Sequence, residues 1–580
     1  MYKLFVSIVI LVGSFSAWGQ TDKSYHLPQG LQKGAYHPTT IIVKLKDAAN
    51  IGTSSKSRSS SGILGKLKST ASISSIENAF PKSIRNKKNV RSTGKSPLEN
   101  IYKVDLNEGE DLVASINSLL ELEEVVYAEP YFAHQPLAIP NDPNANPTTG
   151  AQYYLGVVKA YDAWSIEKGD TNIVIGVLDT GVQPDHPDLR NSIAYNYDDP
   201  INGIDDDGDG LIDNFVGWDY ADDDNNPFAD TDPHGTEMAG ISAATTDNSA
   251  GMAGIGYRSK FLPIKMFRSG SNFFFGGYES IVLAADLGCD VINLSWGSAN
   301  SFSQFGQDAI NYAVLERNVA IVAAAGNDRQ FDNFYPASFD NVLSVAATDI
   351  DDNRAFFSSY SYNVDITAPG VDIYATTNGN SYIFRSGTSE ASAITAGAMA
   401  LVRARFPELT GQQVIEKIRV NTDDIYNIGS NGDLEGLLGK GRLNVAKALE
   451  VNNSPSLRID EVAFDNGSGE HAFFGDTLTI SADIINFLSP TSNAQITLSS
   501  DSPFAEILEG DWGIGVLNTL NETSNSQQPF KVLLSKNLPP NEEIVFKLTM
   551  QDGAYNDFQH FIINSSPERL ELDNGQLELT

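Results

Sequence analysis

The stretch Ile173-Val174-Ile175-Gly176-Val177-Leu178-Asp179-Thr180-Gly181 has the pattern of a buried strand in a parallel sheet. Its first six residues are apolar and largely β-branched, without the alternation of a strand that has one face in water. Asp179 stands at the carboxyl end of this strand, which is the edge where open α/β sheets hold their functional groups. The stretch therefore predicts a parallel α/β sheet with a carboxylate at its working edge.

The residues that follow alternate short apolar strands with helical patterns. We expect strands at residues 261–265, 291–294, 320–323 and 342–345, and helices at residues 278–287 and 307–317. Strands and helices in alternation build a doubly wound parallel sheet with helices on both faces. We expect this α/β domain to span residues 152–452.

Two other stretches supply groups that would complement Asp179. Asp232-Pro233-His234-Gly235-Thr236-Glu237 opens a helix of small residues, and Ser386-Gly387-Thr388-Ser389-Glu390 opens an Ala-rich one. A serine becomes a nucleophile when a base takes its proton, and a histidine base needs a carboxylate to orient it. Asp179, His234 and Ser389 can fill these roles. Taken alone, the Gly-Thr-Ser run fits an ordinary helix N-cap equally well.

Four motifs in this chain order resemble the subtilisin family, the subtilases, whose triad follows the order Asp, His, Ser. They are Asp179-Thr180-Gly181, His234-Gly235-Thr236, Ala324-Ala325-Gly326-Asn327 and Gly387-Thr388-Ser389. The resemblance implies a serine endopeptidase that hydrolyses protein or peptide substrates through an acyl-enzyme. It assigns catalysis to Asp179, His234 and Ser389, and an oxyanion donor to Asn327. It lines the substrate cleft with Ser295, Trp296, Gly297, Ala324, Ala325 and Gly326.

Two acidic residues depart from the family pattern. Glu237 stands where the family usually has a second histidine, and Glu390 stands where it usually has methionine after the serine. We interpret Glu390 as a partly solvated carboxylate in the first turn of its helix, where the dipole favours negative charge. An anion there would also raise the pKa of His234. The departures leave open an alternative, a catalytically silent subtilase-like binding protein of the cell surface.

A dense acidic loop lies between Asp179 and His234. Asp205, Asp207 and Asp209 take positions 1, 3 and 5 of an EF-hand-type loop, with Gly210 at the turn, the Leu211 carbonyl at position 7 and Asp213 at position 9. Position 12 is Val216 rather than glutamate. Oxygen ligands at this density indicate Ca²⁺. The alternative is a solvated acidic loop, but unpaired carboxylates this close repel one another. A glycosidase is disfavoured, because these acids cluster rather than form an isolated pair.

The N-terminal part contains a second α/β pattern at residues 38–135. We expect strands at residues 40–45, 101–106 and 125–130 and a helix at residues 112–120. Residues 51–98, rich in Ser, Lys and Arg, are expected to form a loop with one helix near residues 71–79. By the resemblance, this is a ferredoxin-like propeptide that inhibits the protease. The Pro-rich residues 136–151 are then a linker that contains the maturation site.

After residue 452 the helical patterns stop. Runs at residues 457–459, 477–482, 495–498, 530–534 and 544–550 mostly alternate polar and apolar positions and are separated by turn signals. This pattern predicts an Ig-like β-sandwich over residues 453–580. Its role stays open between a spacer, a surface-binding module and a stabiliser of the protease.

Composition bounds the environment of the 580-residue chain. The formal net charge of −35 argues against a nucleic-acid partner, which would need a basic surface. Cys289, the single cysteine, lies in an apolar run and is expected to be a buried, inert thiol. Residues 1–19 have the basic start, apolar core and small cleavage-site residues of a signal peptide, and no other run is long enough to span a membrane. We expect a secreted or cell-surface monomer, and export without disulfides favours a bacterial source.

Overall fold

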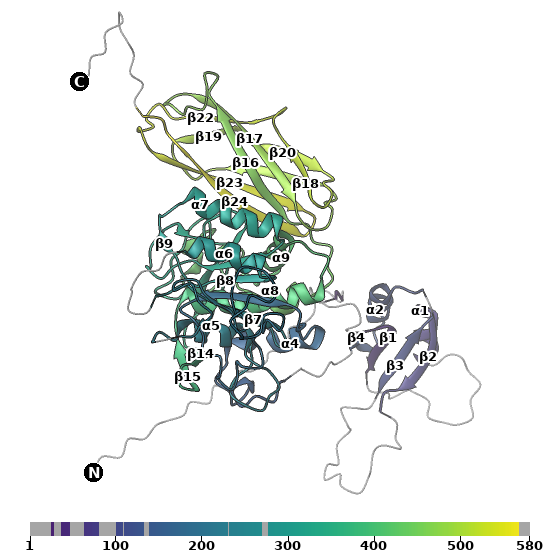
Figure 1. Ribbon diagram of the computed structural model, residues 1–580. Coiled ribbons are helices and arrows are strands. Elements are labelled where there is room, and N and C mark those ends of the chain that lie inside the picture. Colours follow the sequence, from purple (N-terminus) through teal and green to yellow (C-terminus); the bar gives the residue numbers. More distant parts are fainter. Residues whose placement is uncertain are drawn as a thin grey trace, which may run out of the picture. The chain divides into compact units, whose positions relative to one another are not determined.

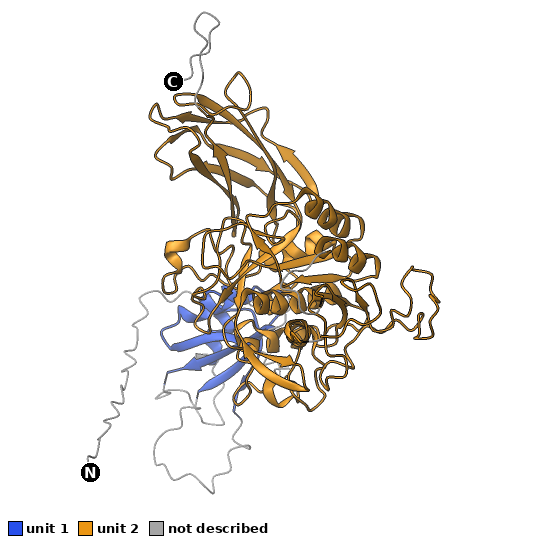
Figure 2. Cartoon of the chain, turned by 60° about the vertical axis from the view of Figure 1, so that its left-hand side comes forward, with its two compact units in different colours: residues 1–136 blue, residues 137–580 orange. Residues whose placement is uncertain are grey.

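Figure 1 shows the computed structural model of the chain. It describes residues 25–27, 36–46, 63–80, 100–107, 109–132, 139–229, 231–268 and 276–567. The chain separates into two compact units, residues 1–136 and residues 137–580 (Figure 2). The predicted signal peptide lies outside the described residues. Among the residues that are described, no helix is both long enough and apolar enough to cross a bilayer.

The described residues of the first unit form an antiparallel sheet and two helices. Its elements are β1 (Tyr36–Leu45), α1 (Ile63–Thr70), β2 (Ile73–Asn78), β3 (Ile101–Leu106), α2 (Leu112–Leu120) and β4 (Val125–Phe132). The strands lie in the order β2-β3-β1-β4. Ile41 and Val43 of β1 are fully buried against Ile116 and Leu119 of α2, so the helix covers one face of the sheet.

The prediction of a helix at residues 71–79 is wrong, because most of this segment forms strand β2. Ile73 pairs with Leu106 and Ile76 pairs with Val104, with a shift of register between Ile73 and Ser75. The irregularity accounts for the spacing of three between the two isoleucines, which otherwise suggests a helical face. Helix α1 lies just before it, in a part of the sequence expected to be a loop.

A parallel sheet of seven strands organises the second unit, which confirms the predicted α/β class. Its strands lie in the order β13-β12-β10-β8-β5-β7-β6, and the registered neighbours are all parallel. They are β5 (Val174–Asp179), β6 (Trp218–Asp219), β7 (Lys260–Lys265), β8 (Val291–Leu294), β10 (Ala320–Ala324), β12 (Val342–Thr348) and β13 (Ile366–Pro369). Strand β5 has β7 on one side and β8 on the other, so the direction of winding reverses beside Asp179.

Helices cover both faces of this sheet. On one side, α5 (His234–Ala243) and α8 (Thr388–Arg405) share a core with Ile175 and Val177 of β5. On the other side, α6 (Gly277–Asp286) and α7 (Gln304–Asn311) pack in a separate core that contains Leu178. Burial on both faces explains why the sequence of β5 is apolar throughout. The unit also contains α3 (Tyr154–Val157), α4 (Ala160–Ile166), α9 (Gly411–Arg419), α10 (Val445–Ala448) and the hairpin β14 (Ile373–Thr377) and β15 (Ser381–Arg385).

The C-terminal part is an antiparallel β-sandwich, which we call the sandwich (residues 453–567). One sheet has the order β16-β17-β22-β19 with β21 beside β17, and the other has the order β20-β18-β23-β24. The strands are β16 (Leu457–Asp465), β17 (Thr477–Asn486), β18 (Ala494–Ser499), β19 (Ala505–Glu509), β20 (Asp511–Gly515), β21 (Asn521–Ser524), β22 (Phe530–Leu534), β23 (Glu543–Asp552) and β24 (Tyr555–Asn564). Alternate residues of β17 and β23, such as Ile480 and Phe546, fill a single core between the sheets.

A close approach of α5 to β14 makes one glycine testable. A Cβ atom on Gly240 would lie 2.0 Å from Thr376 Oγ1, whose hydrogen bond to the Thr236 carbonyl fixes its position. We expect Gly240→Ala to lower the free energy of unfolding by about 1–3 kcal/mol through overpacking. Gly156→Ala is the control, because a Cβ at that position of α3 meets no atom within 4 Å. Denaturant unfolding of both variants measures the difference, and equal stabilities would contradict this packing.

Candidate active site

The three predicted catalytic residues lie at the ends of a strand and two helices, at the working edge of the parallel sheet. Asp179 is the last residue of β5, His234 is the first residue of α5, and Ser389 is the second residue of α8. Gly235 allows α5 to begin against β5, since a Cβ there would lie 2.4 Å from the Gly181 carbonyl oxygen. The close packing of these two elements places the imidazole beside the carboxylate.

A pair of short contacts joins His234 to Asp179. His234 Nδ1 lies 2.8 Å from Asp179 Oδ1 and 3.0 Å from Oδ2, and Asp179 is 3% exposed. The backbone N–H of Thr180 also donates to Oδ1 at 2.7 Å. An ionised carboxylate only accepts hydrogen bonds, so the proton of neutral His234 is held on Nδ1 and Nε2 keeps its lone pair. This is the tautomer that a base needs.

Ser389 lies in a tight turn at the start of α8. Its hydroxyl donates to the Ser295 carbonyl at 3.2 Å, and Ser295 Oγ donates back to the Ser389 carbonyl at 3.1 Å. Glycine at position 387 leaves room for the Glu390 carboxylate, since an added Cβ would approach Glu390 Oε2 to 2.7 Å. In this state of the protein the hydroxyl is therefore held by the end of β8.

Asn327 reaches the same turn from the segment after β10. Its Oδ1 accepts the backbone N–H of Thr388 at 2.9 Å and the Thr388 hydroxyl at 3.1 Å. These bonds direct the amide nitrogen Nδ2 towards Gly387, where it lies 3.6 Å from the position of an added Cβ. An amide donor is thus fixed beside the serine turn.

The six residues predicted to line the cleft follow two neighbouring strands, β8 and β10. Ser295, Trp296 and Gly297 come directly after β8, and Ala324, Ala325 and Gly326 lie at the end of β10. The sequence did not indicate Phe334, which packs against both segments. A Cβ on Gly297 or on Gly326 would come within 2.5 Å or 2.7 Å of the Phe334 ring. Phe334 belongs to a two-residue strand, β11 (Phe334–Tyr335), too short to leave a sequence pattern.

Two buried glutamates accompany the catalytic candidates. Glu237 is 2% exposed and accepts Arg385 Nε at 2.9 Å. Glu390 is 3% exposed, so the expectation of a partly solvated carboxylate is wrong. Its helix begins inside the domain rather than at the surface. Burial raises the pKa of Glu390, against the opposing charges of His234 and Arg385.

The surrounding carboxylates change the basicity of His234. Burial alone would lower its pKa, but Asp179 raises it through charge and hydrogen bonding, and Glu390 and Glu237 add to the effect. The balance raises the pKa of His234 to about 9. Protonated imidazole is therefore stabilised well above the pH at which a free histidine loses its charge.

The acidic loop gathers three of its predicted ligands. Carboxylate oxygens of Asp205, Asp207 and Asp209 lie within 4.8 Å of one another. Asp213 is not in this group, because its carboxylate accepts the backbone N–H groups of Asn202 and Gly203. The backbone N–H of Leu211 donates to Asp209 Oδ1 at 2.8 Å. The loop thus presents a cluster of three carboxylates, with Asp213 as an internal brace.

Comparison with known proteins agrees with this geometry. The model of the subtilase family matches residues 170–449. A thermophilic serine proteinase from Bacillus sp. (strain AK1) is 35% identical over 377 residues, which cover 64% of this chain and 80% of that protein. The chain belongs to the subtilase family. It is a subtilisin-like serine endopeptidase, which decides against the silent binding protein.

Two other subtilases are similar over a shorter part of the chain. Thermitase from Thermoactinomyces vulgaris is 35% identical over 312 residues, which cover 54% of this chain and 99% of thermitase. Subtilisin DY from Bacillus licheniformis is 31% identical over 306 residues, which cover 51% of this chain and 98% of that protein. The similarity to these two subtilases thus spans about half of the chain.

The titration of His234 in this subtilase can be measured by NMR on the Ser389→Ala protein. We expect a pKa of about 9, and a midpoint moved towards 6.5 in Glu390→Gln, which removes a neighbouring carboxylate. Because folding raises this pKa, protonated His234 stabilises the fold below about pH 6.5, and this contribution is lost as the pH rises through about 9.

Glu506→Gln is the control for this titration, since that side chain is exposed on the sandwich strand β19. A midpoint near 6.5 in the parent protein, or one that Glu390→Gln leaves unchanged, would contradict the electrostatic account.

Proposed function

We propose that this chain is a secreted endopeptidase that cleaves peptide bonds with the triad Asp179, His234 and Ser389. His234 Nε2 takes the hydroxyl proton while Ser389 Oγ attacks the scissile carbonyl carbon, and it then gives the proton to the leaving amine. Water repeats the sequence on the acyl-enzyme. The observation that carries the proposal is the hydrogen-bonded Asp179–His234 pair, in which Nδ1 lies close to both carboxylate oxygens. This pair leaves Nε2 basic at the same edge of the sheet as Ser389.

The serine must change partners before it reacts. Its hydroxyl donates to the Ser295 carbonyl, so binding of a substrate has to turn Oγ towards His234. The charge that develops on the substrate oxygen would be stabilised by Asn327 Nδ2 and by the Ser389 backbone N–H at the start of α8. Since the base must be neutral, a His234 pKa of about 9 places the rise of kcat/KM on the alkaline side.

We further propose that the first unit is a propeptide that inhibits its own protease. Its element order β-α-β-β-α-β and strand order β2-β3-β1-β4 support the ferredoxin-like class expected from the resemblance. The mature enzyme would begin after the linker at residues 136–151. Secretion is supported by relatives named as extracellular and cell wall-associated proteases.

A structural Ca²⁺ ion would fit the cluster of Asp205, Asp207 and Asp209. The donors are carboxylate oxygens only, which suits a hard cation, and a cation between them would relieve the repulsion of three close carboxylates. The backbone N–H of Gly208 donates to Asp205 Oδ1 at 2.7 Å and that of Gly210 donates to Oδ2 at 3.0 Å, which fixes that carboxylate in the loop. Such an ion would hold the acidic insertion in one conformation.

Hydrolysis of a chromogenic peptide tests the catalytic assignment. We expect Ser389→Ala to reduce kcat by about 10⁶-fold, the loss known for the nucleophile of a serine triad. Asn327→Ala should reduce kcat by about 10²–10³-fold with little change in KM, because it removes one oxyanion donor. Asn341→Ala, a half-buried asparagine before β12, is the control and should keep kcat. Full activity in Ser389→Ala would overturn the proposal.

Calorimetry on chelator-treated protein tests the metal proposal. Ca²⁺ should bind with measurable heat, and Asp207→Ala, which removes the ligand oxygens altogether, should bind one ion fewer than the parent. Asp206→Ala is the matched control, because it removes the same charge from the same loop but lies outside the cluster, next to Asn202 Nδ2. An unchanged number of bound ions in Asp207→Ala would show that the cluster binds no Ca²⁺.

A further inference from the structure

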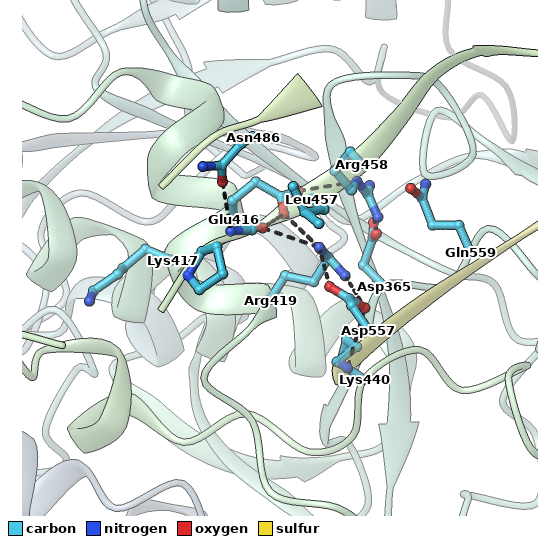
Figure 3. A network of polar contacts seen from close by, with 12 residues as sticks. Asp365, Glu416, Lys417, Arg419, Lys440, Leu457, Arg458, Asn486, Asp557 and Gln559 are labelled. Carbon is cyan, nitrogen blue, oxygen red and sulfur yellow. Dashed lines mark hydrogen bonds and ion pairs between the residues drawn. The ribbon is translucent and has the colours of Figure 1, made fainter. Parts of the chain in front are cut away.

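A buried ion pair joins the α/β domain to the sandwich. Arg419, at the end of α9, is 1% exposed, and Asp557 of β24 is fully buried. The two side chains form a bidentate pair, with Arg419 Nη1 3.0 Å from Asp557 Oδ1 and Nη2 2.8 Å from Oδ2 (Figure 3). Parallel hydrogen bonds of this kind fix the relative orientation of both groups.

Glu416 extends the pair into a network. One turn before Arg419, it accepts Arg419 Nε at 2.8 Å through Oε2 and faces Arg458 Nε of β16 at 3.2 Å through Oε1. Arg458 in turn reaches Asp365 Oδ1 at 2.9 Å. Asp365 Oδ2 accepts the backbone N–H of Ser344 in β12 at 3.0 Å. The sandwich is thereby bonded to the parallel sheet as well as to α9.

Further contacts occupy the remaining acceptor sites of the Asp557 carboxylate. Lys440 Nζ lies 3.3 Å from Asp557 Oδ1 and donates to the Asn556 carbonyl at 2.7 Å. The Tyr555 hydroxyl donates to Asp557 Oδ2 at 2.8 Å and accepts the Leu457 N–H at 2.8 Å. Although burial opposes ionisation, Arg419 and Lys440 lower the pKa of Asp557, so its carboxylate stays charged.

The charges of the two parts are paired across their contact. The α/β domain contributes Asp365, Glu416, Arg419 and Lys440, and the sandwich contributes Arg458 and Asp557. Each sandwich charge contacts two opposite charges of the α/β domain. Breaking a buried pair by removal of one partner is strongly destabilising, because the other charge stays desolvated. A sandwich that moved freely would have to break this network at every excursion.

We propose that the sandwich is a fixed structural part of the protease, locked in one orientation by this charge network, and that it stabilises the α/β domain. The contact falls on α9, which packs against α8, the helix that begins at the Ser389 turn. It also falls on Asp365, directly before β13. Among the roles left open by the sequence, the network favours the stabiliser over the spacer.

A cleavable connection tests this proposal. The site of a specific protease is inserted at Val451, which is 79% exposed, in the full Ser389→Ala chain so that no self-digestion occurs. After cleavage, the two parts of the parent should co-elute in size-exclusion chromatography at micromolar concentration. In Asp557→Asn they should separate, and the uncut variant should unfold at a temperature lower by about 5 °C or more. Glu509→Gln, which removes an exposed pair with Lys531, is the control and should behave as the parent.

Two results would overturn the proposal. If the parts of the cut parent separated, the sandwich would be only tethered. If the parts of cut Asp557→Asn co-eluted and the uncut variant unfolded at the same temperature as the parent, the charges would not hold the sandwich. If Asp557→Asn does not fold, Lys440→Met takes its place. The side chain of Lys440 is 17% exposed, so its substitution should destabilise the fold less than that of Asp557. The cut parts of Lys440→Met should still dissociate faster than those of the parent.

Discussion

The hydrogen-bonded pair of Asp179 and His234 is the contact on which the site depends. It joins the end of β5 to the start of α5 and needs the glycine at 235 to bring the two elements together. The carboxylate is buried and is oriented by the N–H of Thr180, so the imidazole has one tautomer and one direction. The fold can supply this because the parallel sheet reverses its winding beside β5. The serine turn and Asn327 then reach the same edge from α8 and from the segment after β10.

The glutamates at 237 and 390 give this subtilase an unusual electrostatic setting. Both are buried, and both favour the protonated form of His234. In our proposed mechanism the imidazolium is the state that follows proton transfer from serine. The negative charges that raise the pKa of His234 therefore also stabilise the positive charge that forms on it during the reaction. Arg385 balances Glu237 through a direct ion pair, which keeps the cluster from being purely anionic.

The sequence predicted the parallel sheet and its working edge, because apolar runs and chain order report directly on strands buried on both faces. It could not show contacts between residues distant in sequence. Arg385 meets Glu237 only because the β14–β15 hairpin folds back over α5, and Arg419 meets Asp557 across 138 residues. Strand β24 was not predicted either, because the charged Asp557 occupies an inward position and breaks the alternation of polar and apolar residues. The strand at residues 73–78 was missed because its irregular pairing imitates a helical spacing.

The most direct test of the account is covalent labelling with a fluorophosphonate, followed by mass spectrometry of the modified peptide. Our account predicts a single adduct on Ser389 once the first unit has been removed, and no adduct in His234→Ala, because the hydroxyl reacts only when its base is present. An adduct on another serine, or equal labelling without His234, would contradict the assignment of Asp179, His234 and Ser389 as one catalytic unit.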